Sequence, residues 1–147
     1  MTAFRLALAG ALLFGAQAAA KPLCDDLGFS GLLAGCNRMD LPELTLSAGK
    51  PLSDGPLGLS SGVYYRLEIV ADGTQELALI GPEFFRAIWI DEDVVNDIEI
   101  RPMALHSFEF DAAGTLRVTF VAIKPGRYEL KIPGSTGETQ RVDISIQ

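Results

Sequence analysis

The sequence predicts an all-β protein, an antiparallel Greek-key sandwich of short strands. Two observations predict it. From Glu43 onward, apolar and polar residues alternate in short runs, which is typical of strands that bury one face. Between the runs stand turn-forming residues, above all glycine and proline. The alternation predicts a core that contains Phe108, Phe110, Leu116, Val118, Phe120, Tyr128 and Leu130, with Arg117 and Thr119 on the opposite face.

Eight alternating runs are the predicted strands. In chain order they are residues 43–48, 63–71, 75–80, 97–101, 106–110, 115–122, 127–132 and 141–146. The stretch GPEFFRAIWIDEDVV interrupts the alternation. Because proline is tolerated in the first turn of a helix, residues 82–87 are predicted to form a short helical turn between strands.

The separators predict turns. The glycines in residues 72–74 and 112–115 accept positive φ without steric strain, so both segments suit hairpin turns. Residues 124–126 and 132–138 combine a proline, which presets φ, with a glycine.

The N-terminus predicts export. Residues 1–20 contain one arginine, a short apolar run and small residues ending in three alanines, which is the layout of a secretory signal peptide. Its removal would leave residues 21–147: an irregular segment, residues 21–42, and one sandwich domain, residues 43–147. No later apolar run is long enough for a transmembrane helix, so the expected location is the periplasm.

Two cysteines, Cys24 and Cys36, follow the predicted cleavage site. An even count in an exported chain predicts a disulfide, which would staple the irregular segment. The stretch LLAGC, which ends at Cys36, supports an alternative, because bacterial lipoproteins are lipidated on cysteine at such a motif. Charged residues interrupt the apolar run before it and favour the disulfide.

The formal charge of −7 restricts the classes of molecule that this protein is expected to bind. An acidic balance disfavours nucleic acid and anionic membrane surfaces, and it is compatible with basic proteins and metal ions.

The only histidine, His106, lies three residues after Met103 in the stretch RPMALHSFEF. In a strand, His106 would share the core face with Phe108 and Phe110. An imidazole and a thioether together suit copper, particularly copper(I), so Met103 and His106 are candidate metal ligands. The alternative interpretation is structural, with His106 hydrogen-bonded at the rim of the core and Met103 filling space.

Enzyme signatures are not found in the sequence. No serine stands in a nucleophile-elbow motif, no glycine-rich phosphate loop follows a strand, and a disulfide would leave no free thiol. The sequence therefore predicts a protein that is not an enzyme.

The stretch from DIEIR through KPGRYELKIPG resembles the C-terminal half of cupredoxins, the copper-binding sandwiches of exported redox proteins. The resemblance covers about residues 64–146 and implies a cupredoxin-like fold. Under one alignment Glu83 or Phe84 takes the place of the family's upstream histidine, and under another His106 does. The family's blue copper site needs a cysteine, a histidine and usually a methionine in the loop after the KPGRYEL strand. Here that loop reads KIPGSTGETQ and has none of them.

The resemblance leaves two functional hypotheses. The chain is a cupredoxin-like periplasmic protein that handles copper at a non-blue site formed by Met103 and His106. Alternatively, it is a metal-free cupredoxin-like module that binds another exported protein.

Overall fold

The structure, a computed structural model, describes residues 21–147. The predicted signal peptide, residues 1–20, lies outside the described residues. Within residues 21–147, no helix has the length and apolar character needed to cross a membrane.

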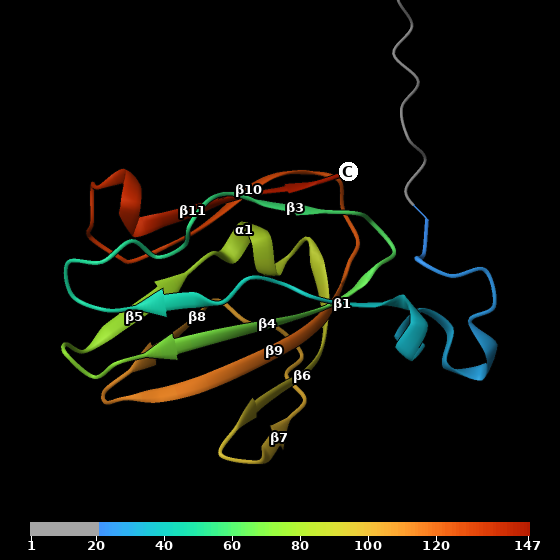
Figure 1. The fold of residues 1–147 in the computed structure, drawn as a ribbon, viewed down its shortest axis with the longest axis horizontal. Coiled ribbons are helices and arrows are strands. Elements are labelled where there is room, and N and C mark those ends of the chain that lie inside the picture. The colour runs from blue at the N-terminus through green and yellow to red at the C-terminus, as the bar shows by residue number, and fades with distance from the viewer. Residues whose placement is uncertain (1–20) are drawn as a thin grey trace, which may run out of the picture.

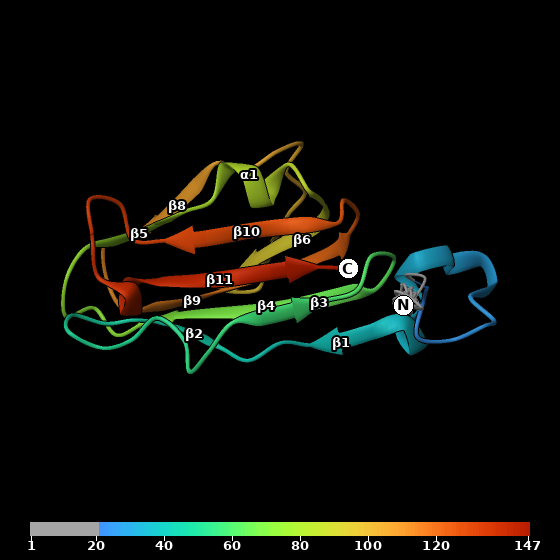
Figure 2. The same ribbon diagram turned by 90° about the horizontal axis from the view of Figure 1, so that it is seen from above.

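Two β-sheets pack face to face (Figures 1 and 2). The first, sheet A, has the order β1-β4-β9-β6-β7, with β2 also paired to β4. Its strands are β1 (Arg38–Asp40), β2 (Leu44–Leu46), β4 (Tyr64–Ala71), β6 (Ile88–Val95), β7 (Ile98–Ile100) and β9 (Gly114–Ala122). The second, sheet B, has the order β3-β11-β10-β5-β8. Its strands are β3 (Leu57–Leu59), β5 (Leu77–Ile80), β8 (Ser107–Phe110), β10 (Gly126–Lys131) and β11 (Arg141–Ile146).

The predicted β-sandwich is confirmed, and each of the eight predicted runs contains a strand. Strands β1, β3 and β6 were not predicted. In β6 the pairing with β9 shifts register between Ile90 and Glu92, because Asp91 forms a bulge. The bulge breaks the period-two pattern, so β6 did not resemble a strand in the sequence.

The long central pairs are antiparallel, as predicted, whereas three short edge pairs are parallel. Strands β1 and β2 both run parallel to β4, and β3 runs parallel to β11. Strand β3, in sheet B, lies between β2 and β4 in the chain. The chain reverses its direction once between β2 and β3 and again between β3 and β4 (Figure 2). Strands β2 and β4 therefore run in the same direction.

Two predicted hairpin turns are wrong. Residues 72–74 connect β4 to β5, and residues 112–115 lead from β8 into β9, so both cross between the sheets. The positive φ of Gly73 is used in such a crossing. A hairpin that was not predicted joins β6 to β7 through Asn96 and Asp97, whose φ values of 49° and 62° are typical of a two-residue turn.

The core lies between the sheets and matches the predicted inward face. Phe120 is completely buried, with Tyr65 and Phe84 at ring-centroid distances of 5.8 and 5.6 Å. The predicted core residues Leu116, Val118 and Leu130 are also buried, and Phe108, Phe110 and Tyr128 are partly buried and packed against the core. Thr119 is on the opposite face, as predicted, but it is buried there.

The described residues also form four short helices: the 3₁₀ helices η1 (Gly28–Leu33), η2 (Gly35–Asn37) and η3 (Glu138–Gln140), and the α-helix α1 (Pro82–Phe85). The helical turn predicted at residues 82–87 is confirmed, with Pro82 in its first turn. Gly81, which precedes α1, lies close to β10. A Cβ atom at this position would collide with Leu130.

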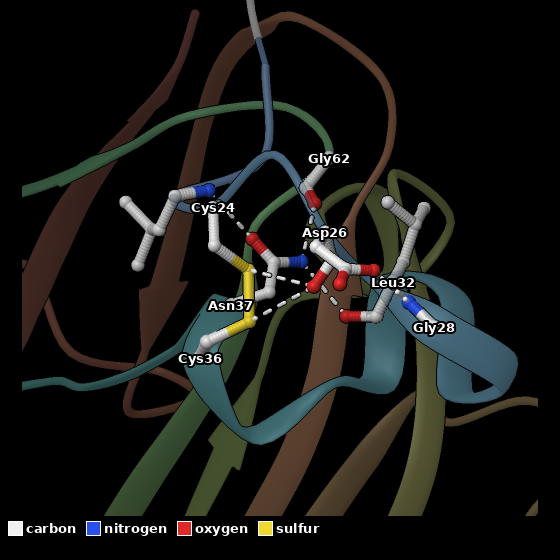
Figure 3. The surroundings of a disulfide bond; sticks show 8 residues. Cys24, Asp26, Gly28, Leu32, Cys36, Asn37 and Gly62 are labelled. Atoms are coloured by element: carbon white, nitrogen blue, oxygen red, sulfur yellow. Dashed lines mark hydrogen bonds between the residues drawn. A yellow bond between two sulfur atoms is a disulfide. The ribbon is translucent and has the colours of Figure 1, made fainter.

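The irregular N-terminal segment is held by the predicted disulfide between Cys24 and Cys36 (Figure 3). The Cys36 sulfur, which would carry the lipid in the alternative interpretation, is part of this disulfide. Beside it, the buried Asn37 accepts the Leu23 N–H at 2.8 Å and donates to the Leu32 and Gly62 carbonyls at 2.8 and 2.9 Å. The Gly62 contact fastens the segment to the sandwich.

Candidate functional site

The two candidate metal ligands lie in the connection between β7 and β8, which comprises residues 101–106. Met103 is fully exposed. His106 is also exposed and immediately precedes β8, with its Nδ1 atom 3.2 Å from Ser107 Oγ. Its backbone carbonyl accepts the Gly81 N–H at 3.3 Å. Phe108 and Phe110 pack against the core, as predicted. The predicted core-facing position of His106 is wrong, because β8 begins one residue after it.

Met103 and His106 border one hollow of about 500 Å³. Residues 103–106 form one side of it. Phe85 of α1 and Ile88 and Ile90 of β6 form an apolar wall, and Arg86 also lines the hollow. The fold therefore brings the two predicted site residues to one cavity, together with apolar side chains that the sequence did not associate with them.

The donor set does not fit a blue copper centre. Such a centre needs a thiolate, and both cysteines of residues 21–147 are joined in the disulfide. Within the same residues no three His, Cys, Asp or Glu side chains gather where they could hold a metal ion. The β10–β11 connection, at the place of the family's ligand loop, contains no cysteine, histidine or methionine. Met103 and His106 remain two soft donors on an open surface.

Acidic residues of β6 form a second cluster, on the outer face of sheet A. Asp91 accepts the Tyr64 hydroxyl and an Arg101 N–H, each at 2.9 Å. Glu92 lies 3.4 Å from Arg101. Burial, and to a lesser extent the Asp91 carboxylate, raises the pKa of Tyr64. Because Arg101 pairs with both acids, the cluster is an ion-pair network rather than an empty cation site.

Asp93 is the polar residue that sequence reasoning missed. It lies opposite Val118 in the β6–β9 register, so it points toward the core side of sheet A. Its side chain is buried, and its Oδ1 atom has no hydrogen-bond partner among the described residues. Burial raises the pKa of the Asp93 carboxyl to about 6. No signal in the sequence reveals this position, because the bulge determines which acid faces inward.

No protein-family model matches the chain, and no curated protein matches it in sequence. Solved structures match it through their folds. A multicopper oxidase from Campylobacter jejuni aligns with a TM-score of 0.50 and 9% identity, over 74% of this chain and 30% of that protein. A copper nitrite reductase from Nitrosomonas europaea aligns with a TM-score of 0.50 and 15% identity, over 65% of this chain and 33% of that protein.

The fold is cupredoxin-like. A blue copper oxidase from Nitrosomonas europaea supports the same conclusion, with a TM-score of 0.50, 12% identity, and coverage of 63% of this chain and 30% of that one. The chain spans about a third of the length of each of these proteins. At such identities the likeness concerns the fold alone, so the function of this cupredoxin-like domain depends on its own residues.

Proposed function

We propose that the chain is a metal-free, cupredoxin-like binding domain, rather than an enzyme, and that it docks another exported protein at the hollow beside α1. The observation that carries the proposal is the hollow itself, where the edges of the buried core residues Phe85, Ile88 and Ile90 lie beside the fully exposed Met103. Apolar side chains that border an open hollow are characteristic of protein-binding surfaces. Methionine suits such a surface because its flexible thioether adapts to different partners.

The lining also defines the partner's chemistry. It includes Arg86 and His106 and no carboxylate. The ion pair of Arg86 with Glu83, at 2.8 Å, is exposed at both ends, so a partner's carboxylate can replace it at little cost. The expected ligand is a protein segment that inserts a bulky apolar side chain and carries an acidic residue beside it.

Export is part of this proposal. It is supported by the signal-peptide layout of residues 1–20 and by the disulfide, which oxidising compartments maintain. Intact-mass analysis of periplasmic and membrane fractions tests it. The expected species begins at Lys21, contains one disulfide and carries no lipid. A diacylglyceryl adduct on an N-terminal Cys36 would reverse both the location and the cleavage site.

Site-specific crosslinking tests the docking site. A photoreactive amino acid at position 103 is expected to capture a specific periplasmic protein, whereas the same group at Phe29, an exposed apolar residue of η1, captures none. The captured protein is then titrated against the purified domain. Met103→Asp should weaken binding at least tenfold, and Phe29→Asp should leave it unchanged. If the two acidic variants weaken binding equally, the partner does not dock at the hollow.

A second candidate function is weak copper(I) binding by Met103 and His106, and it is favoured by their position on the same hollow. Two donors without a thiolate should give a colourless, weak site that is lost when the imidazole is protonated. Competition titration against a copper(I) indicator compares the wild type with His106→Ala and Met103→Ala. Met39→Ala, which removes the partly exposed methionine of β1, is the matched control. If the wild type binds no more tightly than the first two variants, His106 is not a ligand.

A further inference from the structure

Among residues 21–147, no strand covers the outer edge of β7 in sheet A. Strand β7 pairs with β6 on one side, and it is the last strand in the sheet order. All three of its residues are exposed, including Ile98 at 64% and Ile100 at 48% of their surface. The β6–β7 hairpin extends away from the rest of the sandwich (Figure 1). An exposed edge strand with apolar side chains is a template for pairing with another strand.

The turn determines which backbone groups of β7 are free. In a two-residue hairpin, the residues that flank the turn form a hydrogen-bonded pair, here Val95 and Ile98. Because the pattern alternates, Ile98 and Ile100 direct their N–H and C=O groups toward β6. Glu99 therefore directs its N–H and C=O away from the sheet, toward any strand that adds to this edge.

We propose that β7 pairs with β7 of a second copy of this chain, antiparallel and centred on Glu99. In this register Ile98 lies opposite Ile100 of the copy on one face, and Glu99 lies opposite Glu99 of the copy on the other. The strand Ile98–Ile100 is thus complementary to itself in reverse, with apolar side chains opposite apolar side chains. A two-fold axis through Glu99 makes the contact closed and identical in both copies.

One contact in this register is unfavourable, because Glu99 faces Glu99 of the copy. Each carboxylate is partly compensated by its own Arg101, whose guanidinium lies 3.5 Å away. The strand is also short, so the paired area is smaller than that of stable dimers. The association is therefore weak and depends on concentration. This inference does not rest on the proposed docking function.

Sedimentation equilibrium of the mature chain, from about 1 µM to about 1 mM, tests the pairing. The expected result is a monomer–dimer equilibrium with a dissociation constant on the order of 100 µM, because the interface is of the small, transient class. Glu99→Pro removes the outward N–H but no bond to β6, and it should weaken the dimer at least tenfold. Glu99→Ala keeps that N–H and removes the facing carboxylates, and it should tighten the dimer about twofold to fivefold.

A second variant covers the case in which Glu99→Pro disturbs the hairpin. The double substitution Ile98→Lys with Ile100→Lys places lysines opposite lysines, and both positions are exposed, so the monomer should fold normally. It should abolish dimerisation, with circular dichroism and thermal unfolding unchanged. A wild type that stays monomeric at 1 mM, or a double variant that dimerises like the wild type, would overturn the proposal.

Discussion

In its first half, β6 places Ile88 and Ile90 in the core, opposite Ala122 and Phe120 of β9. In its second half, after the bulge at Asp91, the same strand places Asp93 in the inward position, opposite Val118. The first half packs beneath sheet B, and the second half continues into the exposed β7. One extra residue separates a segment stabilised by apolar packing from one that carries a buried acid and an open edge.

Membership of the same sheet therefore does not determine whether a residue is buried and stabilises the core. Ile90 and Ile100 are the same amino acid in neighbouring strands of one sheet, yet one is buried and the other is half exposed. We expect the free energy of unfolding to depend on the first half of β6, and pairing between copies to depend on β7, which follows the second half. The following measurements compare the two halves.

The largest effect is expected at the strand opposite the first half. Phe120→Ala should lower the free energy of unfolding by about 3 to 5 kcal/mol, because the ring is fully buried and its removal leaves a cavity. Urea unfolding measures the loss. A loss under about 1 kcal/mol would mean that this part of the sandwich repacks around the cavity.

A matched pair compares the halves directly. Ile90→Ala should lower the free energy of unfolding by about 2 to 4 kcal/mol, as buried isoleucine truncations do. Ile100→Ala, at the half-exposed position, should lower it by under about 1 kcal/mol. Both are measured on dilute protein, so that pairing between copies does not contribute. Equal losses would show that β7 packs as tightly as the first half of β6.

Asp93, in the second half of β6, should make the free energy of unfolding depend on pH. Its pKa is about 6 in the folded protein against 3.8 for the unburied group, so the folded state holds the proton more tightly. This contribution to stability is present below pH 4, falls as the pH rises to 6, and stays lost above that. With a discount for partial hydration, the raised pKa corresponds to a loss of about 2 kcal/mol in the free energy of unfolding as the pH rises.

Asp93→Asn isolates this contribution, because the amide does not ionise. Unfolding free energies of both proteins are measured from pH 4 to pH 8. Relative to the wild type, the free energy of unfolding of the variant should rise by about 2 kcal/mol across this range. A difference between the two proteins that does not change with pH would show that Asp93 is hydrated in the folded state.

The smallest effect concerns the bulge itself. The Tyr64 hydroxyl donates at 2.9 Å to Asp91, the residue at which the register shifts. Tyr64→Phe should lower the free energy of unfolding by about 1 kcal/mol, the usual contribution of one hydrogen bond. No change in chemical unfolding would indicate that backbone pairing alone maintains the bulge.

Period-two alternation was sufficient to predict β4, β9 and β10 and the burial of Phe120, because these strands bury one continuous face. It could not predict β6, whose phase changes at Asp91, or the three-residue strand β3. The sequence also indicated Met103 and His106 as a pair, and the fold brings both to one hollow. Their apolar neighbours Phe85 and Ile90 come from residues 13 or more positions away, and only tertiary packing reveals such contacts.

The two edges of sheet A are constructed differently. At the edge opposite β7, the short strands β1 and β2 both lie on β4, and Pro42 stands between them without an N–H to donate. A broken edge of this kind gives an incoming strand little to hydrogen-bond. Sheet A can therefore be extended on one side only. Growth along sheet A should stop at two copies, so that crowding in the cell yields a reversible pair and not a fibril.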